Sequence, residues 1–298
     1  MNYAIFGLEV DSDRELPFPE ECEDTDQVCV RLRRVTDLEE RVVDDQLGHL
    51  GDRGVDLQYG GWLFRLDANS AEIAYQPRPI GQLELPFAHI VERMILPLYA
   101  TIAVESNLCL HAGSVVVDGR AWLFIGDTGA GKSTTVYELM HRYDARLASD
   151  EMAVVDVDDL LVRPGAPALR LHRDKDVDGA CEAGEIHPEL DKKWYRFGGD
   201  RLAVGATPLA GIVLLEAEEP GADGPIAESL AGGRRLTRLL RETFEFEEKP
   251  DTWSRRRFGN AATLAKNTRM LSFRYPRSPS GEPTHVPALW EEIADPIG

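Results

Sequence analysis

The chain has 298 residues, of which 33 are lysine or arginine and 52 are aspartate or glutamate, so its formal net charge is −19. A hydrophobic share of 43% suffices for a sizeable core and disfavours wholly disordered and collagen-like chains. The longest apolar stretch, 91–104, contains two charged residues and a proline, which disfavours a membrane span. The surplus of negative charge repels nucleic-acid backbones and anionic membranes, so neither is expected as a partner.

The first residues lack a basic region followed by a continuous apolar segment, so no export signal is expected and a cytoplasmic location is predicted. The four cysteines show no C-x-x-C pair and no zinc-type spacing, which favours reduced thiols; they are Cys22, Cys29, Cys109 and Cys181.

Residues 1–82 alternate short apolar runs with proline, glycine and aspartate, which predicts a β-rich region. The expected strands cover Tyr3–Val10, Val28–Leu32, Trp62–Leu66 and Glu72–Tyr75. Residues 84–107 carry apolar side chains at helical spacing, and Pro97 is expected to kink or divide that helix.

The pattern then changes to strand, loop and helix. Two strands, Ser114–Val117 and Ala121–Ile125, are expected to form a hairpin through Asp118 and Gly119. A helix follows the loop, with an inner face of Val136, Leu139, Met140 and Tyr143. Further strands are predicted at Leu147–Ala148, Met152–Val155 and Gly211–Glu216, a helix at Leu236–Phe244, and loops at Gly221–Pro225 and Ser278–Pro283.

The segment from Gly126 to Ser133 reads Gly-Asp-Thr-Gly-Ala-Gly-Lys-Ser and satisfies the full G-x-x-x-x-G-K-[ST] pattern of a phosphate loop, or Walker A motif. The glycines allow successive backbone N–H groups to surround phosphate oxygens at the positive start of a helix. Lys132 is expected to neutralise the β- and γ-phosphates, and the Ser133 hydroxyl to hold Mg²⁺. The predicted nucleotide-binding residues are Gly126, Asp127, Thr128, Gly129, Ala130, Gly131, Lys132, Ser133 and Thr134.

Two acidic segments are candidates to complete this site. Asp150 and Glu151 follow the return of the first helix to the sheet. Glu216 ends an apolar run, Ile212–Glu216, which has the shape of a Walker B strand. An ordinary core strand with an acid at its exit is the preferred explanation of that run.

Residues 110–151 resemble the HPr kinase/phosphorylase-like kinases, whose core is similar to that of phosphoenolpyruvate (PEP) carboxykinase. Besides the phosphate loop, Leu110–Gly119 is similar to the family's histidine-bearing strand, and Arg146–Glu151 to its L-x-A-D-D segment. Less specific similarity covers Phe6–Asp13, Leu16–Pro17, Pro167–Asp174, Gly211–Glu216 and Leu236–Phe244. The resemblance implies an α/β fold, with a P-loop kinase core of the HPr kinase/PEP carboxykinase type over 83–298 and a β-rich N-terminal region over 1–82.

The resemblance also implies roles for individual residues in an ATP- and Mg²⁺-dependent kinase. Asp150 matches the carboxylate that accepts the proton of the acceptor hydroxyl during phosphoryl transfer. Glu151 takes the place of the second aspartate, so Ser133, Glu151 and Asp150 are the expected Mg²⁺ ligands. His111 matches a histidine near the phosphates and is expected to act in catalysis with Lys132 and Asp150. The alternative for His111 is a hydrogen-bonded core histidine.

Two departures separate this chain from the HPr kinases. The G-x-R-E run that docks HPr is not found, and the connection from the first helix to Asp150 is one residue longer. The expected acceptor is therefore a hydroxyl of a peptide, a protein or a small molecule other than HPr; relatives without the docking signature include lasso-peptide kinases. The alternatives are a nucleotide-responsive regulatory or binding protein with slow or no hydrolysis, and a kinase of a free metabolite. The nucleotide donor and a homo-oligomeric state are left open.

Three further patterns are weighed in the sequence. Asp174–Glu185 satisfies the EF-hand loop pattern, but its flanks are poor helix material, so a solvated acidic loop is preferred to a calcium site. Lys192–Arg196 is either a holder of a phosphate or an anionic acceptor, or surface charge over a docked aromatic residue. Arg255–Arg257 contacts the adenine, contacts an acidic neighbour in an oligomer, or is solvated, and the solvated state is preferred.

Overall fold

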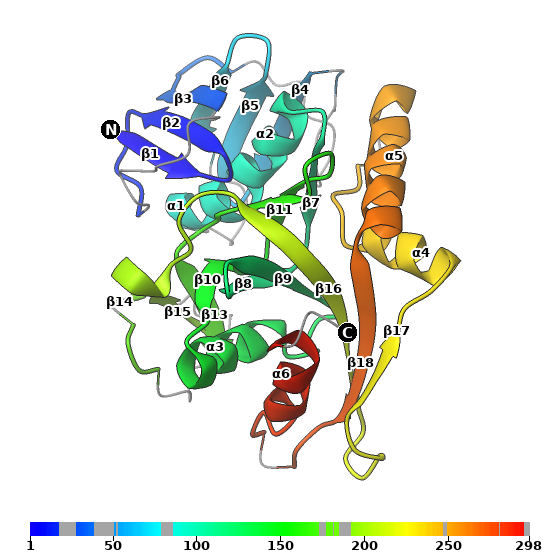
Figure 1. Cartoon of the computed structure of the whole chain (residues 1–298). Coiled ribbons are helices and arrows are strands. Elements are labelled where there is room, and N and C mark those ends of the chain that lie inside the picture. The colour runs from blue at the N-terminus through cyan, green and yellow to red at the C-terminus, as the bar shows by residue number, and fades with distance from the viewer. Residues whose placement is uncertain are drawn as a thin grey trace.

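The computed structural model describes residues 1–17, 28–38, 51, 53–78, 86–172, 177–180, 182–184, 192–246, 249–279 and 281–294. The described residues form an α/β fold with two mixed sheets and a smaller antiparallel one (Figure 1). Among them, no helix combines the length and the apolar character needed to cross a membrane.

The N-terminal region is a six-stranded mixed sheet, which confirms its predicted β-rich character. Its strands, in spatial order, are β1 (Asn2–Ile5), β2 (Leu8–Ser12), β3 (Val28–Arg34), β6 (Glu72–Pro77), β5 (Trp62–Asp67) and β4 (Gly54–Tyr59). The predicted strand Tyr3–Val10 is wrong as a single element, because Phe6 and Gly7 both have positive φ and turn the chain into the β1–β2 hairpin.

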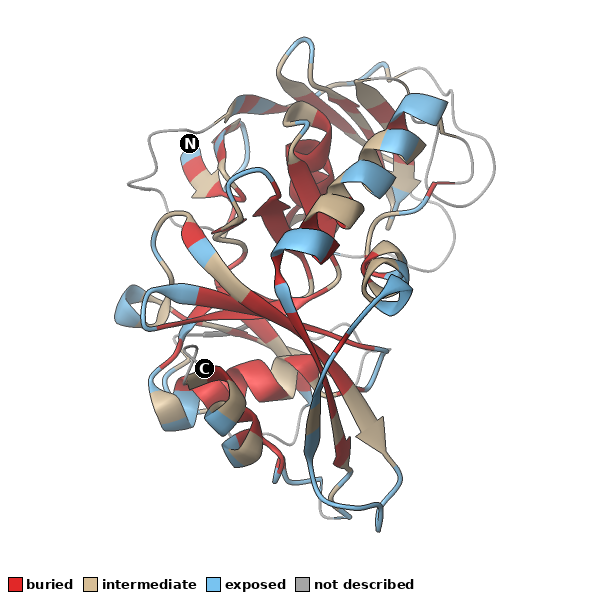
Figure 2. Cartoon of the chain, turned by 45° about the vertical axis from the view of Figure 1, so that its right-hand side comes forward, coloured by how far each residue is buried: buried red, intermediate tan, exposed pale blue. Residues whose placement is uncertain are grey.

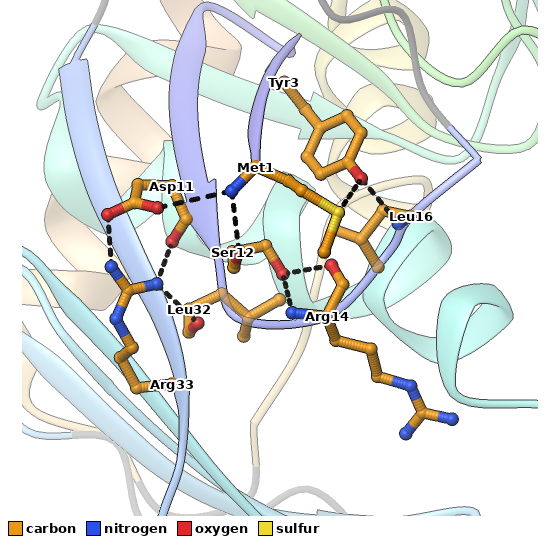
Figure 3. A network of polar contacts seen from close by, with 8 residues as sticks. All are labelled: Met1, Tyr3, Asp11, Ser12, Arg14, Leu16, Leu32 and Arg33. Atoms are coloured by element: carbon orange, nitrogen blue, oxygen red, sulfur yellow. Dashed lines mark hydrogen bonds and ion pairs between the residues drawn. The ribbon is translucent and has the colours of Figure 1, made fainter.

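Polar contacts fix the first residues against this sheet (Figure 3). The amino group of Met1 donates to the carbonyl of Ser12 at 3.0 Å. The guanidinium of Arg33 forms an ion pair with Asp11 and also donates to the Asp11 carbonyl at 2.7 Å. The hydroxyl of Tyr3 accepts the backbone N–H of Leu16 at 2.9 Å. The start of β1 is thereby tied to β2 and β3.

The helix predicted at 84–107 is divided, and its first two residues lie outside the described part of the chain. It consists of α1 (Phe87–Ile90), a π-helical turn at Val91–Ile95, and α2 (Leu96–Ala103). Pro97 lies in the first turn of α2, where its missing N–H is tolerated, and the wider π turn directly precedes it. The helix ends before its predicted boundary because 107–110 form a strand.

The second sheet carries the phosphate-loop motif. Its main strand order is β10 (Arg146–Ser149), β8 (Gly113–Val117), β9 (Arg120–Ile125), β16 (Thr207–Glu218), β12 (Leu161–Arg163), β11 (Ala153–Asp156) and β7 (Asn107–Leu110). Strand β18 (Arg269–Pro276) also pairs with β16, and β17 (Ile226–Ser229) pairs with β18. Because β9, β16 and β18 are parallel, their carboxyl ends meet at one edge.

Helices cover both faces of these strands (Figure 1). On one face, α3 (Lys132–Tyr143) and α6 (Val286–Ala294) share a core with Val213 and Leu215 of β16. On the other, α4 (Gly233–Arg241) and α5 (Asp251–Asn267) share a core with Ile212 and Leu214. The alternation along β16 follows the period of a strand. Figure 2 shows the strands between the helices buried along most of their length and the outer face of α5 exposed.

A third, antiparallel sheet packs beside α3. Its order is β13 (Ala168–His172), β15 (Lys192–Arg196) and β14 (Glu182–Gly184). Leu169, Leu171 and Tyr195 join the core of α3 and α6, so alternate residues of β13 and β15 point to the other side of this sheet.

The core of the N-terminal sheet extends beyond residue 82. It includes Val91, Ile95 and Leu98 of the helical segment and Phe246 after α4. The division of the chain into 1–82 and 83–298 stays a prediction.

Candidate functional site

The glycine-rich loop connects β9 to α3 at the edge where the parallel strands end. Gly126, Gly129 and Gly131 have φ values of 155°, 82° and 81°, which L side chains rarely adopt. A Cβ at Gly126 would lie 2.6 Å from the carbonyl oxygen of Leu215. Helix α3 begins directly after Gly131, so the N–H groups of its first turn, which have no partner within the helix, directly follow the loop.

Residues from the end of the chain support this loop. The hydroxyl of Tyr275, on β18, donates to the carbonyl of Ala130 at 2.6 Å. The Tyr275 ring stacks on His285 with ring centroids 3.8 Å apart, and His285 Nε2 lies 3.0 Å from the Thr135 hydroxyl. Burial lowers the pKa of His285 to about 4, so this histidine is neutral at physiological pH. Sequence reasoning missed these supports, since no local pattern marks them.

Lys132 is buried and folds back over the loop. Its Nζ donates to the carbonyl of Gly126 at 2.7 Å. Burial lowers the pKa of Lys132, while the carboxylates of Glu242, Asp150 and Glu151 oppose that shift. The ammonium group therefore lies at the loop with acidic groups around it.

The fold brings Ser133 and Asp150 together. Asp150 lies in the bend between β10 and β11, and its Oδ1 accepts the Ser133 hydroxyl at 2.9 Å. Its Oδ2 accepts the backbone N–H of Arg170 at 3.0 Å. Burial, followed by the negative charge of Glu151, raises the pKa of Asp150 to about 6. A carboxylate in this state is ionised at neutral pH and can take up a proton readily.

Glu151 has a different environment from its neighbour. Its Oε1 accepts Arg170 Nη1 at 2.6 Å, and its Oε2 is paired with Arg93 Nε. Its φ of 67° is unusual for a residue with a side chain and points its carboxylate between the two arginines. Both carboxylate oxygens therefore have arginine partners, and the prediction that Glu151 is a direct Mg²⁺ ligand remains untested.

His111 lies between β7 and β8, so the histidine predicted on a strand stands just after one. Its backbone N–H donates to the carbonyl of Glu242 at 2.6 Å. Burial, followed by the positive charge of Lys132, lowers the pKa of His111 to about 4. His111 is thus a neutral imidazole near Lys132 and Glu151.

The end of α4 is tied to the glycine-rich loop by charged residues that sequence reasoning missed. Arg238 Nη2 lies 2.8 Å from Asp127 Oδ1, and Arg238 Nε lies 3.1 Å from Glu242 Oε1. Glu242 is buried, and burial raises its pKa. The predicted helix Leu236–Phe244 placed this segment near its true position, although α4 ends at Arg241.

Strand β15 brings the basic segment Lys192–Arg196 to the site. The Trp194 ring lies 4.1 Å from the ring of His89, measured between centroids. Arg196 Nη2 lies 3.6 Å from the carboxylate of Glu92. The Lys192 ammonium is close enough to Lys132 to lower the pKa of that lysine.

The other sequence candidates lie apart or outside the described residues. Glu216 accepts a hydrogen bond from the Ser272 hydroxyl of β18, as expected of an acid at the exit of a core strand. In the Arg255–Arg257 run, predicted to be solvated, Arg257 is instead half-buried and donates to the Leu240 carbonyl at 2.7 Å. Most of the acidic residues of Asp174–Glu185, on which a calcium site would depend, lie outside the described residues.

The described residues contain no group of three or more histidine, cysteine, aspartate or glutamate side chains that could hold a metal ion. The Ser133 hydroxyl and the Asp150 carboxylate are possible oxygen ligands beside the glycine-rich loop. Mg²⁺ at phosphate sites keeps several waters and binds through one or two protein oxygens and the phosphates. This pair therefore fits Mg²⁺ held together with a nucleotide.

No family model matches the sequence, and no curated protein matches it. The chain is similar in structure to the Hpr(Ser) kinase/phosphatase from Coxiella burnetii, with a TM-score of 0.30 and 10% sequence identity. The match covers 62% of this chain and 98% of that one. A likeness at this level transfers no property of that protein to this chain.

Proposed function

We propose that this chain is a phosphotransferase, an ATP- and Mg²⁺-dependent kinase that transfers the γ-phosphate to a hydroxyl group other than that of HPr. The observation that carries the proposal is the contact of Ser133, at the end of the phosphate loop, with the buried carboxylate of Asp150 at 2.9 Å. A loop that holds phosphates and a proton acceptor beside it are the two parts that phosphoryl transfer requires.

The phosphates would lie against the loop amides from Gly126 to Ser133 and the ammonium of Lys132. The oxygen of the acceptor hydroxyl attacks the γ-phosphorus, and the bond from that phosphorus to the oxygen bridging the β- and γ-phosphates breaks. The hydroxyl proton passes to Asp150, and ADP leaves with the bridging oxygen. The pKa of Asp150, about 6, suits a group that accepts a proton and later releases it to water.

Ser133 and Asp150 would hold Mg²⁺, which neutralises charge on the phosphate oxygens when bound. Glu151 positions Arg93 and Arg170 beside Asp150. His111, as a neutral imidazole near Lys132, can donate a hydrogen bond without adding charge.

The test is transfer of label from γ-labelled ATP, with Mg²⁺, into macromolecular and small-molecule fractions of a host lysate. The proposal predicts label in one fraction with the wild-type protein, and loss of that label with Asp150→Asn. Asp159→Asn is the matched control, since Asp159 is exposed on the turn between β11 and β12. Equal transfer by Asp150→Asn would refute the role of this carboxylate.

A second function is a nucleotide-responsive regulator with slow or no hydrolysis. It is favoured by the ion pairs of Glu151 with Arg93 and Arg170. These pairs occupy the Glu151 carboxylate, so of the two neighbouring acids only Asp150 has a carboxylate that no arginine side chain contacts. Label released only as inorganic phosphate, or ATP left unconsumed, supports this function and contradicts the kinase.

A further inference from the structure

Four basic side chains are here called the basic cluster: two contact Glu151, the third pairs with the neighbouring Glu92, and the fourth lies near Lys132. They come from the π-helical turn, from β13 and from β15: Arg93, Arg170, Lys192 and Arg196. The acidic groups among them are Glu92, paired with Arg196, Glu151, paired with Arg93 and Arg170, and Asp150, which accepts the Arg170 backbone N–H. The four cations of the basic cluster thus exceed these three acids by one charge even when all three are ionised, in a chain whose net charge is −19.

The surplus charge is held in place by the fold. Arg170 is fixed through its backbone, whose N–H donates to Asp150, while its guanidinium contacts Glu151. The guanidinium of Arg93 lies between Glu151 and His89, whose Nε2 is 2.9 Å from Arg93 Nη1. These guanidiniums lie beside the proposed proton acceptor and cannot move far from it.

Arg196 donates to the Pro17 carbonyl and pairs with Glu92, whereas the other three members of the basic cluster keep donors without a partner among the described residues. A guanidinium has five N–H donors, and Glu151 and His89 together engage only some of those of Arg93 and Arg170. Lys192 is half-buried and makes no ion pair with another residue that the structure describes.

Glu151 shows which kind of group these arginines bind, because its two carboxylate oxygens are divided between Arg93 and Arg170. Resting on the proposed function, we infer that the acceptor carries an anionic group, a carboxylate or a phosphate, which the basic cluster binds while Asp150 receives the hydroxyl proton. Arg170 contacts Asp150 with its backbone N–H and the adjacent Glu151 with its guanidinium, so the hydroxyl and the anion belong close together in the acceptor. The part of the acceptor that carries the reacting hydroxyl is therefore a hydroxy acid or a phosphorylated alcohol.

The experiment uses three probes with the same three-carbon skeleton: D-glycerate, glycerol 3-phosphate and glycerol. The full chain is first saturated with Mg²⁺ and a non-hydrolysable ATP analogue, so that the γ-phosphate position is filled and cannot take a probe. Each probe is then titrated by calorimetry. Saturable binding of an anionic probe is expected, and none of glycerol. Binding of D-glycerate would identify the anionic group as a carboxylate, and binding of glycerol 3-phosphate would identify it as a phosphate.

Two substitutions test the basic cluster. Arg93→Gln and Lys192→Gln are each expected to weaken binding of the anionic probe about tenfold or more, as the loss of a charge-assisted contact requires. Lys192→Gln breaks no ion pair among the described residues, so it keeps the test valid if Arg93→Gln unfolds. Arg142→Gln is the control, because Arg142 pairs with Glu138 on α3 outside the basic cluster.

Failure of the inference is distinguishable from failure of the proposed function. If the ATP analogue binds but neither anion does, or glycerol binds as well as the anions, the inference is wrong and the kinase proposal stands. Anion binding that persists in both variants also refutes it. Weaker binding of the analogue itself in both variants, without anion binding, assigns the cluster to the nucleotide phosphates and overturns the inference. If the analogue does not bind to the wild-type chain, the proposed function fails.

Discussion

Glu92 tests whether burial near the site keeps a carboxyl group protonated to higher pH. Its side chain, on the π-helical turn, is 4% exposed and forms an ion pair with Arg196 Nη2 at 3.6 Å. Burial raises the pKa of Glu92 from 4.5 to about 7, although Arg196 and Arg93 oppose the rise. The folded chain therefore holds this proton to higher pH than the unfolded chain does.

The sign of the effect on stability follows from that difference. Because the folded chain binds the Glu92 proton more tightly than the unfolded chain, protonation of Glu92 favours the folded state. This stabilisation is fully present below pH 4.5 and is lost as the pH rises through about 7. The rise in pKa corresponds to about 3 kcal/mol of unfolding free energy at most. Glu92→Gln removes the titration, so the difference in unfolding free energy between about pH 5 and about pH 8 is expected to shrink by about 2–3 kcal/mol.

Urea unfolding at both pH values measures this difference for the wild type and the variant. Glu282→Gln, at an exposed glutamate, is the control and should leave the difference unchanged. If Glu92→Gln shows the same pH dependence as the wild type, the assignment of a raised pKa to this buried carboxyl is wrong.

Three further predictions concern the loop and its acid. Tyr275→Phe leaves the Ala130 carbonyl without its hydrogen-bond donor, which costs about 1–3 kcal/mol. Calorimetry should therefore show ATP affinity reduced about tenfold, and unchanged affinity would contradict the supporting role of Tyr275. Gly126→Ala places a Cβ 2.6 Å from the Leu215 carbonyl, and ATP binding should be lost; wild-type affinity would show that the loop adapts. The transfer rate should fall toward acid pH, where Asp150 becomes protonated and stops accepting protons, and a flat pH–rate profile there would count against it.

The parts of the fold that were predicted correctly are those with strong local patterns. The hairpin at Asp118–Gly119 has positive φ at both turn residues, as its sequence indicates, and α3 buries Val136, Leu139 and Met140 as its spacing predicts. Helix α5, at Asp251–Asn267, was missed although it has 17 residues, because only four of them are buried and their spacing is irregular. Packing against β7 and α4, rather than a local apolar stripe, gives this helix its place.

The residues of the site also separate into those that a local pattern predicts and those that it does not. Ser133 and Asp150 were predicted together because motif and resemblance mark both. Arg93 lies in a segment that was interpreted by its apolar spacing alone, and Tyr275 lies far along the chain from the loop it supports. Such residues reach the site through tertiary packing and carry no local signal.

The measurement that tests the central claim most directly compares two quantities in one preparation of Asp150→Asn. The first is affinity for ATP without Mg²⁺, which the loop and Lys132 determine, and the second is the rate of phosphate transfer with Mg²⁺. The kinase account predicts ATP affinity close to that of the wild type and transfer slowed by about 10²-fold or more. Transfer at the wild-type rate, or no ATP binding by the wild-type chain, would contradict it.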